Sequence, residues 1–124
     1  MLENEISQKV IGLAIKIHKK LGPGLLEKVY HECLYYEIQK SGLQVQKEVC
    51  VHVVYEEIKI ERAFKIDLLV ENKLIVELKS VKELNDLFTA QILTYLKLSK
   101  IRLGLLINFN ELLLKDGIRR VINN

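Results

Sequence analysis

The chain has 124 residues, of which 49% are hydrophobic and 28% are charged, the composition of an ordinary globular protein. Its length fits one domain, which we expect to span residues 1–124, and it permits a core that needs no disulfide bonds. The formal net charge of +3 allows an anionic partner but does not by itself indicate one.

The first residues, MLENEISQ, carry two acids and no apolar run, so we expect no signal peptide. The longest apolar runs, such as LLIN near residue 105, are too short to span a bilayer, and we expect no membrane partner. Cys33 and Cys50 have no CxxC pattern and no histidine-rich neighbourhood. We therefore predict that both are reduced core residues of a cytoplasmic protein.

Two helices are predicted at the start of the chain. Residues 4–20 carry apolar side chains at three- and four-residue steps, which indicates an amphipathic helix with Asn4 as its predicted N-cap. The turn Gly22-Pro23-Gly24 ends this helix. The same periodicity predicts a second helix over 25–41, which ends at Ser41-Gly42.

An alternation of apolar and polar residues then predicts three strands, over residues 44–54, 58–70 and 74–80, joined by polar turns. A period of two assigns side chains to faces. In the second strand we expect Phe64, Ile66, Leu68 and Val70 to share one face. In the third strand the apolar residues at even positions should face away from Glu77 and Lys79.

The last third of the chain predicts a helix over 83–99 that is apolar nearly all round and should be well buried. The strand predicted over 102–108 is almost wholly apolar, as in strands covered on both faces, and a short strand near 118–122 adds to an edge. The order ααβββαββ indicates an α/β fold with a central mixed sheet flanked by helices. We expect a right-handed parallel crossover through the helix at 83–99.

Charged residues inside apolar strands are unusual unless they are paired or functional. If the turn at 71–73 is a three-residue loop, Val70 pairs with Leu74, and Asp67 then lies opposite Glu77 on the same face. A two-residue loop would separate the two carboxylates and the apolar residues as well. The hydrophobic pattern and the carboxylate pair therefore favour the same register.

Two carboxylates within roughly 5 Å repel one another unless positive charge lies between them. Lys79 supplies one positive charge, and a divalent cation would supply the rest, with oxygen ligands selecting Mg²⁺ or Mn²⁺ over zinc. The alternative is an ordinary ion pair between Glu77 and Lys79 on an exposed face.

Other polar residues have two interpretations each. Gln91 and Tyr95 share a helix face and either bind phosphate beside Lys79 or serve the core. Glu27 is either a capping residue, at the third position of a helix capped by Gly24, or a further acid near the metal. We expect structural roles for His18, His31 and His52, and we expect the lysines at 9, 16, 19 and 20 to form a solvated helix face. No GxxxxGK[ST], GxGxxG, HExxH or GxSxG motif is present.

The segment Gly24-Leu25-Leu26-Glu27-Lys28-Val29-Tyr30 reads G-x-x-E-x-x-Y. Together with IVELKSV at 75–81, AQILTYLKL at 90–98 and LGLLINFNELLLKD at 103–116, it resembles the GxxExxY proteins, a branch of the PD-(D/E)XK nuclease-like superfamily. The resemblance covers nearly the whole chain. It implies a restriction-endonuclease-like core of one helix, three strands, a helix and a strand.

The resemblance also implies roles for individual residues. Asp67 and Glu77 match the acidic metal ligands of active members, and Lys79 matches the lysine of E-x-K. Glu27 matches an acid on the helix before the sheet, and Gln91 matches a polar position on the following helix. The Leu78 carbonyl is expected to complete the metal site. Ile66 stands where members of the superfamily often have proline.

The first hypothesis is a Mg²⁺-dependent (or Mn²⁺-dependent) phosphodiesterase acting on DNA or RNA, with Asp67, Glu77, Lys79 and Gln91 as catalytic residues. A second is a non-catalytic module that uses the nuclease fold to bind nucleic acid or a protein, since the chain has no dense basic patch. A third hypothesis is that the helix at 4–20 mediates a homodimer, because many small nucleases need two copies to cut two strands.

Overall fold

The computed structural model describes all residues 1–124. Every predicted helix and strand is present, and no boundary differs from its prediction by more than three residues. In chain order the elements are α1 (Glu3–Leu21), α2 (Glu27–Lys40), β1 (Val45–Tyr55), β2 (Ile58–Val70), β3 (Leu74–Lys79), α3 (Asp86–Ser99), β4 (Leu103–Asn108), the 3₁₀ turn η1 (Leu114–Gly117) and β5 (Ile118–Ile122). None of the helices combines the length with the apolarity that crossing a bilayer requires.

The five strands form one mixed sheet in the order β1-β2-β3-β4-β5. Only β3 and β4 are parallel, and α3 connects them, as expected for the crossover. β5 lies at the edge beside β4. The pairing of Val70 with Leu74 and of Leu68 with Val76 confirms the predicted three-residue turn.

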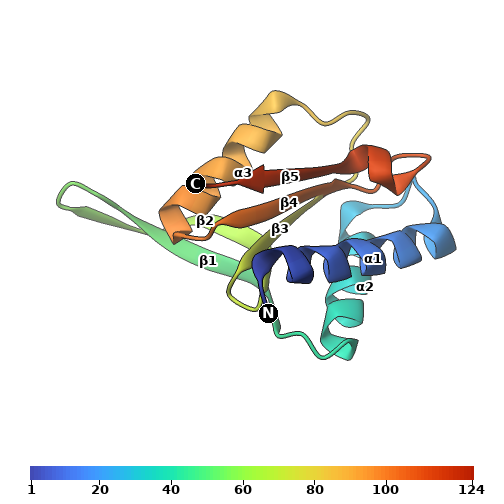
Figure 1. Cartoon of the computed structure of the whole chain (residues 1–124). Helices are drawn as coiled ribbons and strands as arrows, with labels where there is room; N and C mark the ends of the chain where they lie inside the picture. The colour runs from blue at the N-terminus through green and yellow to red at the C-terminus, as the bar shows by residue number, and fades with distance from the viewer.

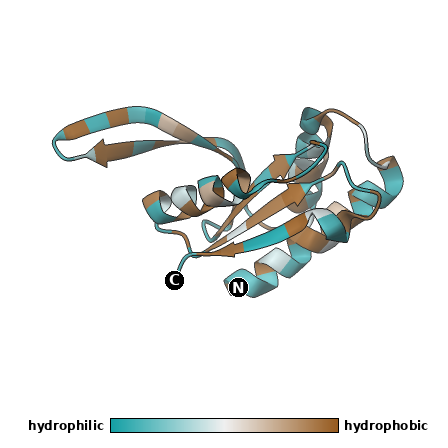
Figure 2. Ribbon diagram, turned by 90° about the horizontal axis from the view of Figure 1, so that it is seen from above, coloured by the Kyte–Doolittle hydropathy of each residue, from teal (hydrophilic) through white to brown (hydrophobic).

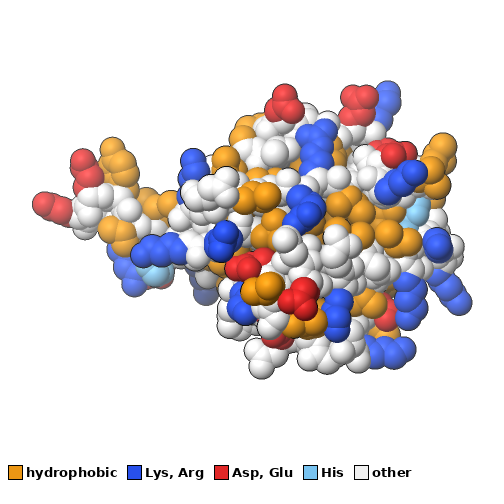
Figure 3. Space-filling model, viewed as in Figure 1, with side chains coloured by type: hydrophobic (Ala, Val, Ile, Leu, Met, Phe, Trp, Pro, Cys, Tyr) orange, Lys and Arg blue, Asp and Glu red, His pale blue; other side chains and the backbone are white.

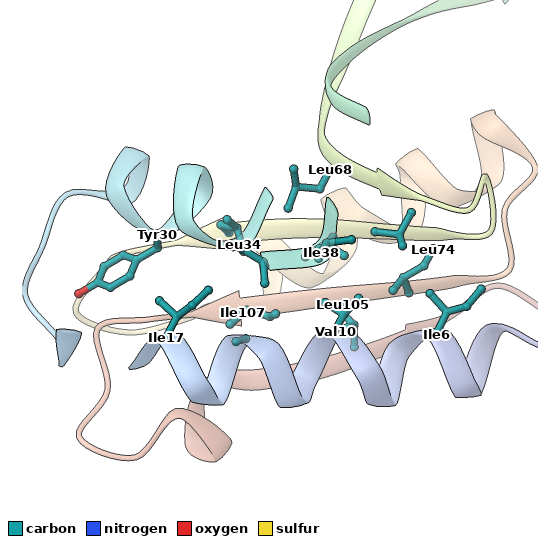
Figure 4. Packing of buried hydrophobic residues seen from close by; sticks show 14 of the residues in the cluster. Ile6, Val10, Ile17, Tyr30, Leu34, Ile38, Leu68, Leu74, Leu105 and Ile107 are labelled. Atoms are coloured by element: carbon teal, nitrogen blue, oxygen red, sulfur yellow. The ribbon is translucent and has the colours of Figure 1, made fainter. Parts of the chain in front are cut away.

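Helices cover both faces of the sheet (Figure 1). On one face α1 and α2 pack against β3 and β4, through residues such as Ile6, Leu34 and Leu105 (Figure 4). On the other face Ile92 and Leu96 of α3 pack against a smaller cluster on β2, β3 and β4. Gly104 lies beneath α3, where an added Cβ would come within 3.0 Å of Ile92, so this glycine allows the helix to approach the sheet closely.

The prediction for the faces of β2 is wrong. Leu68 and Val70 belong to the core beneath α1 and α2, whereas Ile66 and Phe64 pack on the α3 side. The strand changes face at Asp67, just beyond the last pair of its ladder with β3, where the Asp67 amide donates to the Glu77 side chain. The prediction for β3 is confirmed, with the even-numbered residues in the larger core and Ile75 in the smaller one.

Four local predictions also need correction. α3 is not buried all round: Leu87 is 73% exposed, and only one side of the helix contacts the sheet. Leu2, not Asn4, is the N-cap of α1, and its amide donates to the Glu5 carboxylate. α2 is capped by Leu26 rather than Gly24. Cys33 packs against the core, but Cys50 is an exposed strand residue; both are free thiols.

A long hairpin arm leaves the body of the protein, as Figures 1 and 2 both show. β2 pairs with β3 only over Leu68–Val70, and the rest of β2 pairs with β1 alone. We call residues 51–64 the arm. Its pairing shifts between Val51 and Val53, where three residues of β2 lie opposite His52. Figure 2 shows the arm standing beside α3 at the side of the sheet.

Candidate active site

Asp67 and Glu77 lie side by side where β2 and β3 separate. The Asp67 amide donates a hydrogen bond to Glu77 Oε2 at 2.8 Å, and the Leu78 amide donates one to Asp67 Oδ2 at 2.9 Å. Each carboxylate therefore holds the backbone of the other strand and keeps its second oxygen free of protein hydrogen bonds. The two acids are close together, as predicted. They are joined by these side-chain hydrogen bonds, because the backbone pairing of β2 with β3 stops at Leu68 and Val76.

Burial dominates the electrostatics of this pair. Glu77 is only 7% exposed. Burial raises the pKa of its carboxyl to about 8, and the nearby Asp67 and Glu27 carboxylates act in the same direction. The hydrogen bond from the Asp67 amide and the charge of Lys79 lower this pKa, but they do not offset the burial. The site is therefore short of positive charge.

Glu27 is the first residue of α2 and faces the same site. Its side chain stays accessible to solvent, yet partial burial and then Asp67 raise the pKa of its carboxyl, while Lys79 and His31 lower it. Because α2 begins at Glu27, this residue is not at the third helical position, and no side-chain cap is formed. The capping interpretation of Glu27 is wrong, so the residue is available for another role.

Lys79 lies at the end of β3, half-buried, with its Nζ 4.6 Å from the centre of the Phe88 ring on α3. This cation–π contact directs the ammonium toward the α3 side of the sheet, the side that also carries Ile75 and Glu77. Lys79 lowers the pKa of both Glu77 and Glu27, so it shares the site with both acids.

The two candidates on α3 differ. The Tyr95 ring stacks on Phe64 with 4.3 Å between ring centres. Burial raises the pKa of the Tyr95 phenol, and Glu77 and Asp67 raise it further, so Tyr95 is part of the acidic site. Gln91 lies one turn earlier on the same helix, is exposed, and makes no side-chain hydrogen bond. Tyr95 therefore lies within reach of the charges of the acidic pair, and the exposed Gln91 side chain has no partner within the protein.

His31, for which the sequence predicts only a structural role, lies next to the site. Its Nε2 lies 3.2 Å from the Asp67 carbonyl oxygen, which can only accept, so Nε2 carries the proton in this contact. The four-residue step from Glu27 to His31 on one helix was the available signal. His18, in contrast, is buried against the Glu111 carbonyl, and His52 is exposed on the arm; neither belongs to the site.

Tyr30, the last residue of G-x-x-E-x-x-Y, was also missed. Its hydroxyl donates to the Gly22 carbonyl at 2.6 Å and accepts from the Leu25 amide at 3.0 Å. Ser80, next to Lys79, donates to the Leu25 carbonyl at 2.7 Å. The loop before Glu27 is thereby tied to the strand that carries Lys79. Positive φ angles at Gly22 and Gly24 allow this tight path.

The chemistry of the donors fits a hard divalent cation. Asp67, Glu77 and Glu27 offer carboxylate oxygens, which suit Mg²⁺ or Mn²⁺. The buried Glu77 carboxyl, protonated near neutral pH for lack of positive charge, would ionise beside such an ion. No three side chains of the Asp, Glu, His or Cys type converge closely enough to surround an ion by themselves. Mg²⁺ commonly keeps several waters and takes only one or two carboxylates.

Comparison with known families decides the class of fold. A family model described as the PD-(D/E)XK nuclease superfamily matches residues 4–121. The chain belongs to the PD-(D/E)XK nuclease superfamily. A search of curated proteins found no match. The mixed sheet with helices on both faces agrees with the PD-(D/E)XK nuclease fold, and membership of this superfamily supports a nuclease-like function.

Proposed function

We propose that this chain is a Mg²⁺- or Mn²⁺-dependent nuclease that hydrolyses phosphodiester bonds in DNA or RNA, with residues 1–124 acting as one domain. The observation that carries the proposal is the pair formed by the half-buried Asp67 and the buried Glu77 at the point where two strands separate. A buried carboxylate beside a second one, without enough positive charge, is costly to keep ionised. Membership of the superfamily supports nuclease chemistry as the use of this pair.

Asp67 and Glu77 would hold the ion through their free oxygens, with the Leu78 carbonyl and Glu27 as further ligands, Glu27 directly or through water. When bound there, a divalent cation would lower the pKa of a water and neutralise charge on the phosphate. Lys79 would orient the attacking water and donate to the phosphate oxygens as negative charge develops on them. Gln91 would bind the phosphate from α3.

The motif at Gly24–Tyr30 leads us to infer that the chain belongs to the GxxExxY branch of the superfamily.

The proposal is tested by calorimetry of Mn²⁺ and Mg²⁺ titrated into the wild type and into two variants, Asp67→Ala and Asp116→Ala. Asp116 is an exposed acid on η1 and serves as the matched control. We expect binding to the wild type and the control and none to Asp67→Ala. Cleavage of single- and double-stranded DNA and RNA is then assayed with the ion that binds.

The second candidate is a non-catalytic module that binds nucleic acid or a protein. The observation in its favour is that no three ligand side chains converge around one point. This candidate predicts no heat with either ion and no cleavage of any substrate, with nucleic-acid binding that is unchanged in Asp67→Ala. That combination of results would contradict the nuclease proposal.

A further inference from the structure

Asp67 has no partner residue in the ladders on either side of its strand. The ladder of β2 with β3 stops one residue after it, at Leu68. The ladder of β2 with β1 has partner pairs before and after this point, but it omits Asp67 and the residue opposite, Glu48. Glu48 has a positive φ of 52°, which departs from the extended backbone of a strand. The ladders therefore do not fix the backbone of Asp67.

Two side chains hold this backbone instead. Glu77 Oε2 accepts from the Asp67 amide at 2.8 Å, and His31 Nε2 donates to the Asp67 carbonyl at 3.2 Å. The amide belongs to the planar peptide unit before the Cα atom of Asp67, and the carbonyl belongs to the unit after it. The two contacts together restrain the rotations on both sides of this Cα atom. These rotations set the direction of the Asp67 carboxylate.

His31 makes its contact from α2, the helix that begins with Glu27. The His31 side chain is only 12% exposed, so little water competes for its hydrogen bond. Among the hydrogen bonds of α2 side chains, only that of His31 reaches β2, and the others end on α1, on β1 and on the loop before α2. His31 therefore ties the helix that carries one acid of the site to the strand that carries another.

Two other roles for His31 fit less well. Its Nδ1 lies 3.7 Å from Glu32 Oε1, which is too long for a hydrogen bond, and Glu32 is exposed and also pairs with Lys47. An exposed ion pair of this kind adds little to stability. His31 also lowers the pKa of Glu27, but burial, Asp67 and Lys79 each have a larger effect on that carboxyl. The contact with the Asp67 carbonyl is the shorter of the two polar contacts of the ring.

We propose that His31 is a positioning residue, whose hydrogen bond to the Asp67 carbonyl sets the direction of the Asp67 carboxylate and thereby the affinity of the site for a divalent cation. The inference rests on the proposed function, in which Asp67 is a ligand of the ion. Replacement of a group that orients a metal ligand typically weakens metal binding by roughly 10- to 100-fold. His31 holds its ligand through the backbone, so we expect a loss near the lower end of this range.

Two variants separate the hydrogen bond from the volume of the ring. His31→Phe keeps a ring and removes the donor, whereas His31→Gln places an amide N–H near the position of Nε2. His52→Phe is the control, because it makes the same change at an exposed position on the arm, which stands clear of the rest of the molecule (Figure 3). Calorimetry should show about tenfold weaker Mn²⁺ binding to His31→Phe, and wild-type affinity for His31→Gln and His52→Phe.

Hydrogen exchange measured by NMR in the presence of a chelator tests the positioning without any ion. The Asp67 and Leu78 amides donate to the acidic pair. In His31→Phe these two amides should exchange at least about tenfold faster than in the wild type, whereas the amides of β4 should keep their wild-type rates. Unchanged exchange at Asp67 would overturn the proposal. Equal acceleration of all amides would overturn it as well, because His31 would then only stabilise the fold.

A double variant tests whether His31 acts through Asp67 or through the charge of Glu27. His31→Phe should weaken Mn²⁺ binding by the same factor in the wild type and in a Glu27→Gln background. A loss that disappears in the Glu27→Gln background would overturn the action through Asp67.

The two measurements also separate this inference from the proposed function. A wild type that binds no Mn²⁺ contradicts the nuclease proposal and the effect of His31 on metal affinity, while the exchange rates still decide whether His31 orients Asp67. A wild type that binds Mn²⁺ no more tightly than His31→Phe would overturn the role of His31 in metal binding and leave the nuclease proposal standing. Binding to His31→Gln as weak as that to His31→Phe would overturn the role of the N–H donor.

Discussion

The hydroxyl of Tyr30 contacts two backbone groups of the loop before its own helix, the Gly22 carbonyl at 2.6 Å and the Leu25 amide at 3.0 Å. Its ring is fully buried and stacks on Phe109 at 4.4 Å. Glu27 begins α2 directly after this loop, so the Tyr30 hydroxyl helps to fix the position of the third acid of the site. Gly24, the glycine of G-x-x-E-x-x-Y, lies between the two residues that the Tyr30 hydroxyl contacts, and Glu27 begins the helix that follows.

The variant Tyr30→Phe keeps the stacking on Phe109 and removes both hydrogen bonds. We expect a loss of about 1 kcal/mol in the free energy of unfolding, measured by urea denaturation. We also expect weaker Mn²⁺ binding by calorimetry, because the loop no longer fixes Glu27. Tyr36→Phe, on an exposed tyrosine of the same helix, should change neither quantity. Equal Mn²⁺ affinity in Tyr30→Phe and the wild type would show that the loop does not position Glu27.

The raised pKa of Glu77 predicts a pH dependence of stability in the metal-free protein. Between about pH 4.5 and about 8 the unfolded chain has released this proton and the folded chain still holds it. The stability that Glu77 contributes is therefore complete below pH 4.5 and is lost as pH rises to about 8. Glu77→Gln cannot ionise, so its stability relative to the wild type should rise over this range by up to a few kcal/mol.

The measurement is urea denaturation of both proteins in the presence of a chelator, from pH 4 to pH 9. Parallel stability curves for Glu77→Gln and the wild type would contradict the raised pKa. Addition of Mn²⁺ should stabilise the wild type more at pH 9 than at pH 6, because the ligand must lose its proton before the ion binds.

Lys79→Ala should abolish cleavage and leave the fold intact. The side chain is half-buried, and the cation–π contact with Phe88 accounts for only about 1 kcal/mol. Loss of its proposed interactions with the attacking water and the phosphate should lower kcat by at least about a hundredfold. Lys82→Ala, three residues away and exposed, is the control. A purified Lys79→Ala protein that cuts as fast as the wild type would remove Lys79 from the mechanism.

Asn108→Ala should destabilise the protein. Asn108 is fully buried opposite Lys79 in the β3–β4 pairing. Its side chain accepts from the Val81 amide at 3.0 Å and donates to the Val81 carbonyl at 2.9 Å. Removal leaves the Val81 and Asn110 amides without this acceptor, while the Val81 carbonyl keeps the Asn110 side chain as a donor, and the expected cost is roughly 2–3 kcal/mol in chemical denaturation. Asn124→Ala, at the exposed C-terminus, should be neutral; an equally small effect at Asn108 would mean that water replaces the amide.

Patterns along one element were predictable from the sequence. A period of two assigned the faces of β3, and the burial of one face fixed the register of β2 on β3 through the turn at 71–73. Together these two patterns predict that Asp67 lies near Glu77. The strand that follows α3 and its parallel pairing with β3 were predictable for the same reason, since an apolar strand must be covered on both faces.

Features that depend on contacts between distant segments were not predictable. The change of face at Asp67 arises because Glu77, ten residues away, takes its amide. The link between Ser80 and Leu25 spans 55 residues. The apolar composition of α3 predicts more burial than the helix has, because the sheet covers only one of its sides. The alternation of apolar and polar residues in β1 and β2 is the same for a strand covered by the sheet and for a projecting arm, so it did not reveal the arm.

The exchange of hydrogen bonds between Asp67, Glu77 and Leu78 has a consequence for how this site can be lost. The two acids end the pairing of β2 with β3, so they support the sheet as well as any ion. A relative without the proposed catalytic activity still needs an acceptor for the Asp67 and Leu78 amides. Such relatives should therefore carry asparagine at 67 and glutamine at 77 more often than alanine, since an amide oxygen keeps these hydrogen bonds after the charge has gone.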